Sequence, residues 1–281
     1  MNEINKTPKK LAVINDFTGY GSCSQTTAIP VVSVMGIKAC PVPTAIFSNH
    51  LAFPTWHKYD YTPHLKDYLS AWEKLNLHFN GILCGLLGNG AQAAILSPFI
   101  EKQKQDAKAL FILDPIMGDH GKLYSSISPD YYKDILILLK YADIITPNLT
   151  EACILTGTPF PEELPDETFL SSMANQLHVM GPNRIVITGI EENGFFHNYI
   201  SESYPTPVKT FYSTKAGGPS RPGTGDIFSA IIAADALNGV SLHDSVKKAT
   251  DFIRICTKSS AAANIPINEG VCFEKYLNLL I

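Results

Sequence analysis

The sequence predicts an α/β fold with a mostly parallel central sheet and helices on both faces. Three observations support this prediction: short apolar runs alternate with longer segments of helical period, several of these runs are apolar at every position, and 45% of the 281 residues are hydrophobic while 17% are charged. A strand covered on both faces is continuously apolar, whereas a half-exposed strand alternates. We therefore expect a well-packed sheet with crossover helices.

Six apolar runs are predicted to form the parallel strands, at residues 11–15, 37–43, 81–84, 110–114, 143–147 and 184–188. Between them, Thr62 and Ser128 each precede a proline. This order is typical of a helix N-cap with proline at the first helical position, and it predicts helices over 64–77 and 130–141. Asp166 precedes apolar residues at spacings of three and four, which indicates another capped helix.

The pattern changes after the sixth strand. Aromatic residues and proline breaks over 194–212 favour a hairpin, so the sheet should gain a small antiparallel addition. The last third is predicted to be helical, over 224–238, 242–263 and 269–280. Residues 213–222, STKAGGPSRP, are the most loop-like stretch. Lys215 and Arg221 within it make this stretch a candidate mobile flap over an anionic ligand.

Charge and cysteine content argue against several function classes. The net charge is −4, from 22 basic and 26 acidic residues, and the absence of a long basic run argues against nucleic-acid binding. No apolar stretch approaches the roughly 18 residues that span a bilayer, and residues 1–10 form a polar lead-in without a secretory signal. We therefore expect a cytoplasmic protein that does not associate with membranes. The six cysteines lack zinc-binding spacing and are expected to be buried free thiols.

Polar residues gather where the predicted strands end, which is where open α/β sheets bind ligands. Carboxylate and amide oxygens from several strand ends could together hold a metal–phosphate group, because hard cations prefer oxygen ligands. For Asp16, Asp114 or Asn148 taken alone, helix capping is an alternative role. The strand-end residues are Asn15, Asp16, Asp114, Asp119, Thr146, Asn148, Glu151, Thr188 and Gly189.

The sharpest local pattern is Gly223-Thr224-Gly225-Asp226, followed by an apolar helix. Glycines let the backbone turn closely under a ligand, and the free amides of a helix N-terminus bind anions. A transferring phosphoryl group would fit such a site. Asp226 is then placed either to complement the helix dipole or to accept the proton of an attacking hydroxyl. No P-loop, nucleophile elbow or zinc-protease helix is present, and the other glycine-rich segments lack the full dinucleotide-binding spacing.

Four motifs resemble the ribokinase superfamily and, within it, the pyridoxal/pyridoxamine (vitamin B6) kinases. They are F-S-N-H at 47–50, D-P-I-M-G-D at 114–119, T-P-N with Glu151 at 146–151, and G-T-G-D at 223–226. The last motif marks the superfamily, and the other three are typical of the B6-kinase branch. The resemblance extends from about residue 11 to 263 and implies a single ribokinase-like domain over 11–281.

The resemblance implies an ATP-dependent kinase that phosphorylates the 5′-hydroxymethyl group of pyridoxal, pyridoxamine or pyridoxine. Asp226 would be the general base, and the amides of Gly223, Thr224 and Gly225 would stabilise the transferred phosphoryl group. Mg²⁺ and a monovalent cation, K⁺ or Na⁺, would be held by Asp114, Asp119 and Glu151. A homodimer is also implied. The nucleotide would be bound by Asp114, Thr146, Asn148, Glu151, Thr188, Gly189, Lys215, Gly223 and Gly225.

Three residues depart from the B6-kinase pattern. Asp16 stands where these kinases usually have Ser, Leu51 where they usually have Thr, and Leu86 where a Tyr is often found. The phosphate-binding motifs match the family, so the reaction type is better supported than the identity of the acceptor. Asp16 favours pyridoxamine or a related aminomethyl compound, because a carboxylate pairs with a cationic amine. The resemblance places the vitamer pocket at Asp16, Ser48, Asn49, His50, Leu51 and Asp226.

Two alternatives remain beside the B6 kinase. One is a kinase of the same fold that acts on hydroxymethylpyrimidine or another small alcohol. A non-catalytic ligand-binding protein on the same scaffold would have no need for Asp226 as a base. His50 is able either to hold its loop by hydrogen bonding or to contact the substrate.

Overall fold

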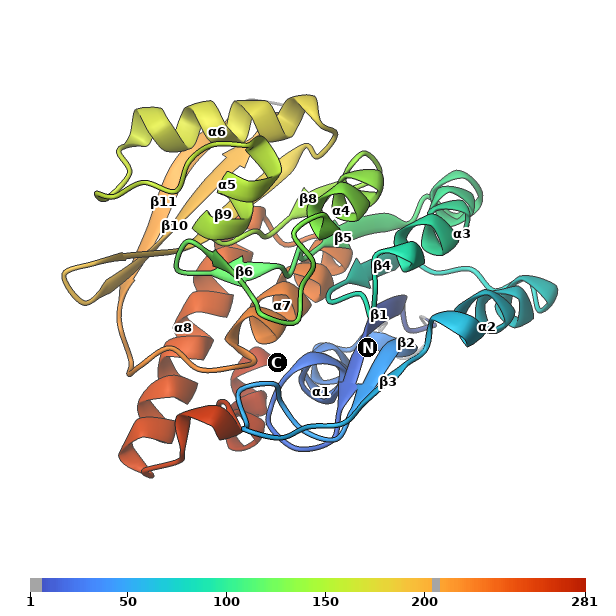
Figure 1. Ribbon diagram of the computed structural model, residues 1–281, viewed down its shortest axis with the longest axis horizontal. Helices are drawn as coiled ribbons and strands as arrows, with labels where there is room; N and C mark the ends of the chain where they lie inside the picture. Colours follow the sequence, from blue (N-terminus) through green and yellow to red (C-terminus); the bar gives the residue numbers. More distant parts are fainter. Residues whose placement is uncertain (1–6, 204–207) are drawn as a thin grey trace, which may run out of the picture.

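The computed structural model describes residues 7–203 and 208–281. A nine-stranded sheet lies at the centre, in the order β11-β10-β9-β8-β5-β4-β1-β2-β3, with helices on both faces (Figure 1). The predicted fold class is therefore confirmed. The strands of this sheet are β1 (Lys10–Thr18), β2 (Lys38–Phe47), β3 (Lys58–Asp60), β4 (Gly81–Cys84), β5 (Leu110–Leu113), β8 (Ile144–Ile145), β9 (Arg184–Glu192), β10 (Phe195–Glu202) and β11 (Val208–Lys215).

The middle of the sheet is parallel and both of its edges are antiparallel. All neighbours from β2 to β9 pair in parallel. The predicted antiparallel addition is formed by β10 and β11, whose connection at 204–207 lies outside the described residues. At the other edge β3 pairs antiparallel with β2, which the sequence patterns did not indicate. A separate two-stranded ribbon joins β6 (Gly118–Asp119) and β7 (Lys122–Leu123).

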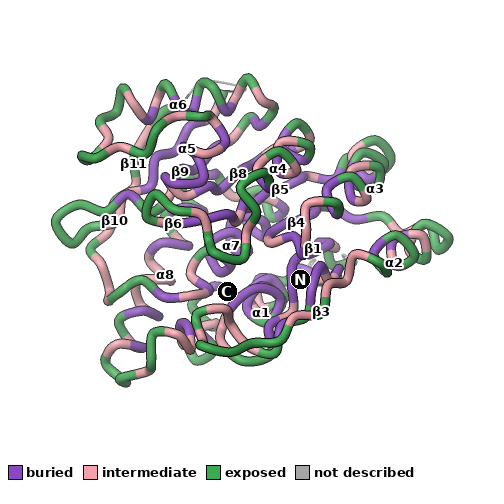
Figure 2. The backbone as a smooth tube through the Cα atoms, viewed as in Figure 1, coloured by how far each residue is buried: buried purple, intermediate pink, exposed green. Residues whose placement is uncertain are grey.

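The helices divide between the two faces, and each face has its own apolar core. One core packs against α2 to α6, and the other against α1, α7 and α8. Figure 2 shows the buried backbone concentrated along the sheet and along α7, with exposed residues on the outer sides of the peripheral helices. The helices are α1 (Ser24–Val34), α2 (Thr62–Lys74), α3 (Ala91–Ala107), α4 (Tyr131–Leu139), α5 (Leu149–Thr156), α6 (Glu167–Val179), α7 (Thr224–Asn238) and α8 (Leu242–Ala262).

Two of the three predicted helix caps were wrong. Thr62 is the first residue of α2, and Asp60 Oδ1 accepts from its backbone amide at 2.9 Å. Likewise α4 begins after Asp130, and neither helix has a side-chain cap from its N-cap residue. The cap of α6 is confirmed, since the Asp166 side chain accepts from the Phe169 amide at 2.7 Å.

Several element boundaries also differ from prediction. The helix expected over 269–280 is replaced by two 3₁₀ segments, η1 (Ile267–Glu269) and η2 (Glu274–Leu280). Lys10 already belongs to β1, and the last three residues of β11 lie inside the predicted flap 213–222. The sequence patterns did not reveal α1 and α3, each of which contains an internal proline. Residues 1–6 of the polar lead-in lie outside the described residues.

The cysteine prediction holds in part. All six cysteines are free, and four of them are buried, but Cys40 and Cys272 are only half-buried. Among the described residues, no helix is long and apolar enough to cross a membrane.

Candidate active site

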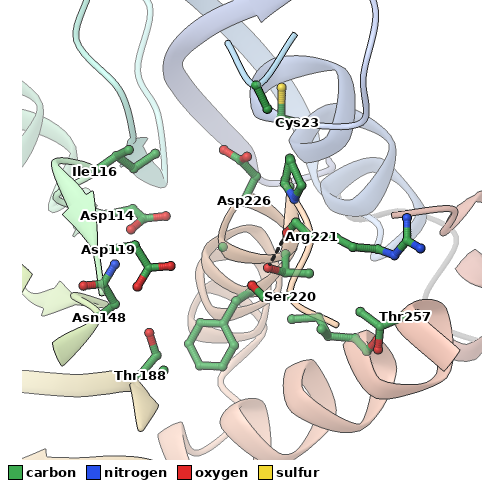
Figure 3. Close-up of a pocket in the computed structure, with 18 of the residues that line it drawn as sticks. Cys23, Asp114, Ile116, Asp119, Asn148, Thr188, Ser220, Arg221, Asp226 and Thr257 are labelled. Carbon is green, nitrogen blue, oxygen red and sulfur yellow. Dashed lines mark hydrogen bonds between the residues drawn. The ribbon is translucent and has the colours of Figure 1, made fainter. Parts of the chain in front are cut away.

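A cavity of ≈ 680 Å³ opens at the carboxyl ends of the parallel strands. It is bounded by the N-terminus of α7, one face of α8 and the segment that follows β11. Figure 3 shows Asp114, Asp119 and Thr188 on one side of this pocket and Asp226 on the other. The pocket brings together most of the predicted site residues: Asp16, His50, Leu51, Leu86, Asp114, Asp119, Thr146, Asn148, Glu151, Thr188, Gly189, Lys215, Gly223, Thr224, Gly225 and Asp226.

The N-terminus of α7 is built as an anion-binding site. Gly223 is its N-cap, with φ +84°, and the first backbone bond of the helix runs from Ile227 N to Gly223 O at 3.0 Å. The amides of the three preceding residues therefore lie outside the helical ladder. The Thr224 hydroxyl donates to Arg221 O at 3.0 Å, which anchors the turn. These amides and the helix dipole are suited to a phosphoryl group.

Asp226 lies in the first turn of this helix, with 9% of its surface exposed. Burial is the main reason that its pKa is raised to about 6, and the nearby Asp16 carboxylate raises it further. Hydrogen bonds from the Ser24 amide and the Asn15 side chain act in the opposite direction. A carboxylate with a pKa near 6 is ionised at neutral pH and is a stronger base than an exposed Asp.

Asp16 is almost completely buried at the end of β1. Its two carboxylate oxygens accept hydrogen bonds from Ser24 Oγ and Thr18 Oγ1, both at 2.7 Å. Burial raises the pKa of Asp16 despite these two bonds. The result is a polar cluster in the pocket beside apolar residues such as Leu51 and Leu86.

The predicted residues 48–50 divide between two roles. Ser48 and Asn49 are not among the residues that line the pocket. Ser48 Oγ accepts from the His57 amide at 2.9 Å, and Asn49 Nδ2 donates to Thr55 O at 2.9 Å, so both side chains hold the loop that follows β2. His50 lines the pocket, and its Nδ1 accepts from the Ala52 amide at 3.1 Å.

A second carboxylate group lies across the pocket from Asp226. Burial raises the pKa of Asp114, and the nearby carboxylates of Glu151 and Asp226 raise it further. Burial likewise raises the pKa of Glu151 to about 8. The described residues show no salt bridge to Asp16, Asp114, Glu151 or Asp226. Buried carboxylates without a cationic partner favour the binding of a cation.

Asn148 and Glu151 also fix the start of α5. Glu151 donates its amide to Asn148 Oδ1 at 2.9 Å, and Glu151 Oε2 accepts from the Asn148 amide at 2.8 Å, which completes a capping box. Glu151 Oε1 accepts from the Met117 amide at 3.0 Å, and Asn148 Nδ2 donates to Gly118 O at 2.8 Å. The capping role weighed from sequence is therefore present for Asn148, and it ties α5 to the D-P-I-M-G-D segment.

The side of the pocket next to α8 contains residues that the strand-end argument missed. Asn198 on β10 donates to Thr250 on α8 at 3.0 Å, and Arg254 and Thr257 follow along the same helix. None of these residues belongs to a motif, and two of them are 52 positions apart in sequence. Their helical spacing within 250–257 was the only available signal.

Arg221 does not supply free positive charge to the pocket, contrary to the sequence-based expectation. With only 5% of its surface exposed, its guanidinium donates to Ile265 O at 2.8 Å, Pro266 O at 3.0 Å and Gly270 O at 3.1 Å. Pro266 and Gly270 flank η1 (Ile267–Glu269), and Ile265 directly precedes Pro266, so these bonds hold both ends of η1. Arg221 thus anchors the segment before α7 to the C-terminal region.

The family model described as phosphomethylpyrimidine kinase matches residues 29–271. The chain belongs to the phosphomethylpyrimidine kinase family. The pyridoxal kinase PdxY of Pseudomonas syringae pv. tomato is 28% identical over 259 residues, covering 89% of this chain and 86% of the relative. The pyridoxal kinase of Dictyostelium discoideum is 25% identical over 285 residues, covering 93% and 86%. The resemblance to vitamin B6 kinases is therefore confirmed.

Solved structures agree with this assignment. A Bacteroides thetaiotaomicron protein, provisionally named a phosphomethylpyrimidine kinase and crystallised with pyridoxal, is 31% identical. It matches with a TM-score of 0.91, covering 98% of this chain and 96% of its own. Pyridoxal kinase from Lactobacillus plantarum is 25% identical with a TM-score of 0.88, covering 98% and 97%. Members of the family thus share the whole fold described above.

Proposed function

We propose that this protein is an ATP-dependent kinase that phosphorylates the 5′-hydroxymethyl group of a vitamin B6 vitamer. One observation carries the proposal: the buried Asp226 carboxylate, with a pKa raised to about 6, lies in the same helix turn as the Thr224 and Gly225 amides, which are outside the helical ladder. A base and an anion hole side by side are what phosphoryl transfer to a hydroxyl requires. The pyridoxal kinases among the relatives, and the pyridoxal in the Bacteroides structure, support the acceptor.

The reaction would proceed as an in-line transfer. The vitamer hydroxyl oxygen forms a bond to the γ-phosphorus of ATP, and the bond from that phosphorus to the bridging oxygen of ADP breaks. Asp226 accepts the proton that the hydroxyl loses. The amides of Thr224 and Gly225 stabilise the charge on the transferring phosphoryl oxygens. Positioning supplies much of the acceleration, because this chemistry needs little covalent participation by the protein.

ATP would occupy the side of the pocket between β9 and α8. Thr188 and Gly189 lie within β9, and Thr188 N donates to Pro147 O at 2.9 Å, which joins this strand to the T-P-N motif. Thr146 lines this side of the pocket, and its side chain lies close enough to Asp114 to lower the pKa of that carboxyl by hydrogen bonding. Asn148, Lys215 and Arg254 also line this side and complete the proposed nucleotide site.

The carboxylates fit the binding of Mg²⁺ with ATP. The described residues contain no cluster of three metal-ligating side chains. Mg²⁺ in kinases is commonly held by one or two carboxylates together with substrate phosphates and water, so a full protein cage is not required. We propose that Asp114, Asp119 and Glu151 hold Mg²⁺ and a monovalent cation, K⁺ or Na⁺. When bound, the metal would neutralise phosphate charge.

The vitamer would bind beside Asp16, His50, Leu51 and Leu86. The apolar leucines are suited to a pyridine ring, and Asp16 supplies a buried carboxylate for a cationic aminomethyl group. The proposed preference is therefore for pyridoxamine. Ser48 and Asn49 would shape this end of the pocket through their loop.

The proposal treats residues 11–281 as one kinase domain, since β1 and α7, which lie far apart in sequence, supply the same pocket. We also propose that the protein is a homodimer, as the resemblance to B6 kinases implies, and that it is cytoplasmic. Sedimentation velocity would test the dimer directly.

A second candidate is phosphorylation of hydroxymethylpyrimidine, because the matching family model is described by a related pyrimidine, as phosphomethylpyrimidine kinase. Steady-state assays with pyridoxal, pyridoxamine, pyridoxine and hydroxymethylpyrimidine, each with Mg-ATP, separate the two. We expect the highest kcat/KM with a B6 vitamer. A higher kcat/KM with hydroxymethylpyrimidine would mean that this compound is the acceptor, while the proposed phosphoryl-transfer reaction would stand.

The same assays distinguish an enzyme from a binding protein. Asp226→Asn should abolish turnover while ATP binding, measured by calorimetry, is largely retained. Turnover that survives in this variant would refute Asp226 as the base. A wild-type protein that binds these ligands and phosphorylates none would refute the kinase.

A further inference from the structure

Asn15 lies at the end of β1 and contacts the proposed base directly. It is 5% exposed, and its Nδ2 donates to Asp226 Oδ1 at 3.0 Å. The pairing of β1 with β2 shifts register between Asn15 and Phe17. Such a bulge redirects the side chains of a strand. Leu11 and Val13, earlier in the strand, pack in the same core as α7, so Asn15 continues the face of β1 that meets this helix.

The orientation of the Asn15 amide is fixed by two further bonds. Its Oδ1 accepts from the Asp16 amide at 3.0 Å and from the Leu86 amide at 2.9 Å. Both of these donors are backbone groups, so the oxygen of the side chain must face them. The nitrogen of the side chain is thereby directed at Asp226. Three elements, β1, the turn after β4 and α7, meet at this one amide.

Gly85 leaves the space in which this amide fits. A Cβ at Gly85 would lie 2.7 Å from Asn15 Nδ2, 2.8 Å from its Cγ and 2.9 Å from its Oδ1. Gly85 has no positive φ, so alanine would meet no backbone strain there. The three atoms nearest to an alanine Cβ at this position all belong to the Asn15 side chain.

We propose that Asn15 is a positioning residue for phosphoryl transfer, holding the Asp226 carboxylate in the orientation that receives the proton of the acceptor hydroxyl. The inference rests on the proposed kinase function and adds a residue outside its four motifs. A carboxylate that rotates freely about its side-chain bonds would meet the hydroxyl in only part of its orientations. The directed Asn15 donor holds Oδ1 of this carboxylate, and together with the Ser24 amide it limits that rotation.

A double-mutant cycle tests this role. Asn15→Ala should lower kcat by about tenfold to a hundredfold, as expected for a misplaced catalytic group, with the KM values for ATP and vitamer within about threefold of wild type. Gly85→Ala should act in the same direction, because its methyl group displaces the amide. In the Asn15→Ala background the added methyl meets no amide, so the double variant should match Asn15→Ala.

A matched control is Asn89→Ala. Asn89 Nδ2 also donates to an aspartate, Asp60 Oδ2, at 2.7 Å, and Asn89 does not line the pocket. This variant should keep the wild-type kcat, and thermal unfolding of every variant shows whether it is folded. Gly85→Ala alone still tests the proposal if Asn15→Ala does not fold.

Three results would overturn the role of Asn15: a kcat within threefold of wild type in Asn15→Ala, an effect confined to KM, or losses that multiply in the double variant. The cycle is run with whichever acceptor the wild type phosphorylates, so a change of acceptor leaves the test intact. Wild-type turnover with unaffected variants refutes Asn15 alone. No wild-type turnover with any acceptor refutes the proposed function and this role together.

Discussion

The two glycines of the G-T-G-D motif face different physical constraints, so alanine should affect each in a different way. Gly223 has φ +84°, and a Cβ there would lie 1.9 Å from the backbone oxygen of Ser22. Gly225 has no positive φ, and a Cβ there would meet nothing within 4 Å. The first glycine is required by the fold. The second lines the pocket, and we expect a side chain there to obstruct the proposed anion-binding site.

The cost of Gly223→Ala has two sources. A side chain in the left-handed region costs about 1–2 kcal/mol, and forcing a methyl group against fixed backbone costs about 1–3 kcal/mol. The total is about 2–5 kcal/mol. Unfolding entropy of about 2.1 cal/mol/K per residue gives roughly 0.6 kcal/mol/K for this chain. The melting temperature should therefore fall by about 3–8 °C. Gly225→Ala should leave it unchanged or raise it slightly, because alanine is about 1 kcal/mol better than glycine within a helix.

Gly225→Ala, which should not lower the melting temperature, should instead lower the activity. Gly225→Ala places a methyl group beside the amides that would stabilise the phosphoryl group, so kcat should fall by about tenfold or more while the protein stays fully folded. Scanning calorimetry and steady-state kinetics on both variants provide the test. If Gly223→Ala melts like wild type, the close contact with Ser22 does not constrain the fold. If Gly225→Ala keeps full kcat, the anion-hole assignment fails.

Three further predictions follow from the site. Since Asp226 must be deprotonated to act as a base and its pKa is raised to about 6, kcat/KM should fall as the pH is lowered through about 6; a flat profile from pH 5 to 8 would contradict this role. Asp16→Ser should shift the preference from pyridoxamine toward pyridoxal, and an unchanged ratio of kcat/KM values would exclude Asp16 from amine recognition. Arg221→Met should lower the melting temperature through the loss of three carbonyl contacts, with the KM for ATP little changed; a large rise in that KM would instead assign Arg221 to phosphate binding.

The central strands could be predicted because they are covered on both faces, so that their residues are apolar at every position. Gly81–Cys84 is buried at every position, and its predicted bounds are those of β4. The helices α1 and α3 escaped prediction because each carries an internal proline, Pro30 and Pro98, and tertiary packing outweighs that local penalty. The 3₁₀ segment η1 is held by contacts from Arg221 and Ser22, which no local pattern reveals.

Site residues could be predicted where they directly follow, or lie at the end of, a predicted parallel strand. Parallel strands bring their carboxyl ends together, so Asp16, Asp114 and Thr188 could be grouped without a structure. The residues on α8 could not, since a helix face contributes to the pocket only through the way it packs. Arg221 shows where sequence reasoning predicted too much. A basic residue beside a glycine-rich loop suggests phosphate binding, but three backbone carbonyls already accept the hydrogen bonds of its guanidinium.

The loss of Arg221 from the phosphate-binding set changes the electrostatics of the proposed reaction. Buried carboxylates at Asp16, Asp114, Glu151 and Asp226 surround a pocket in which the described residues offer them no salt bridge. The phosphates of ATP would add further negative charge to this pocket. Helix amides compensate only part of that charge, because a helix N-terminus carries about half of one elementary charge. Lys215 and Arg254 also line the pocket, so a kinase with this pocket, in a chain of net charge −4, would balance the phosphates with these two side chains, the helix amides and cations that arrive with the nucleotide.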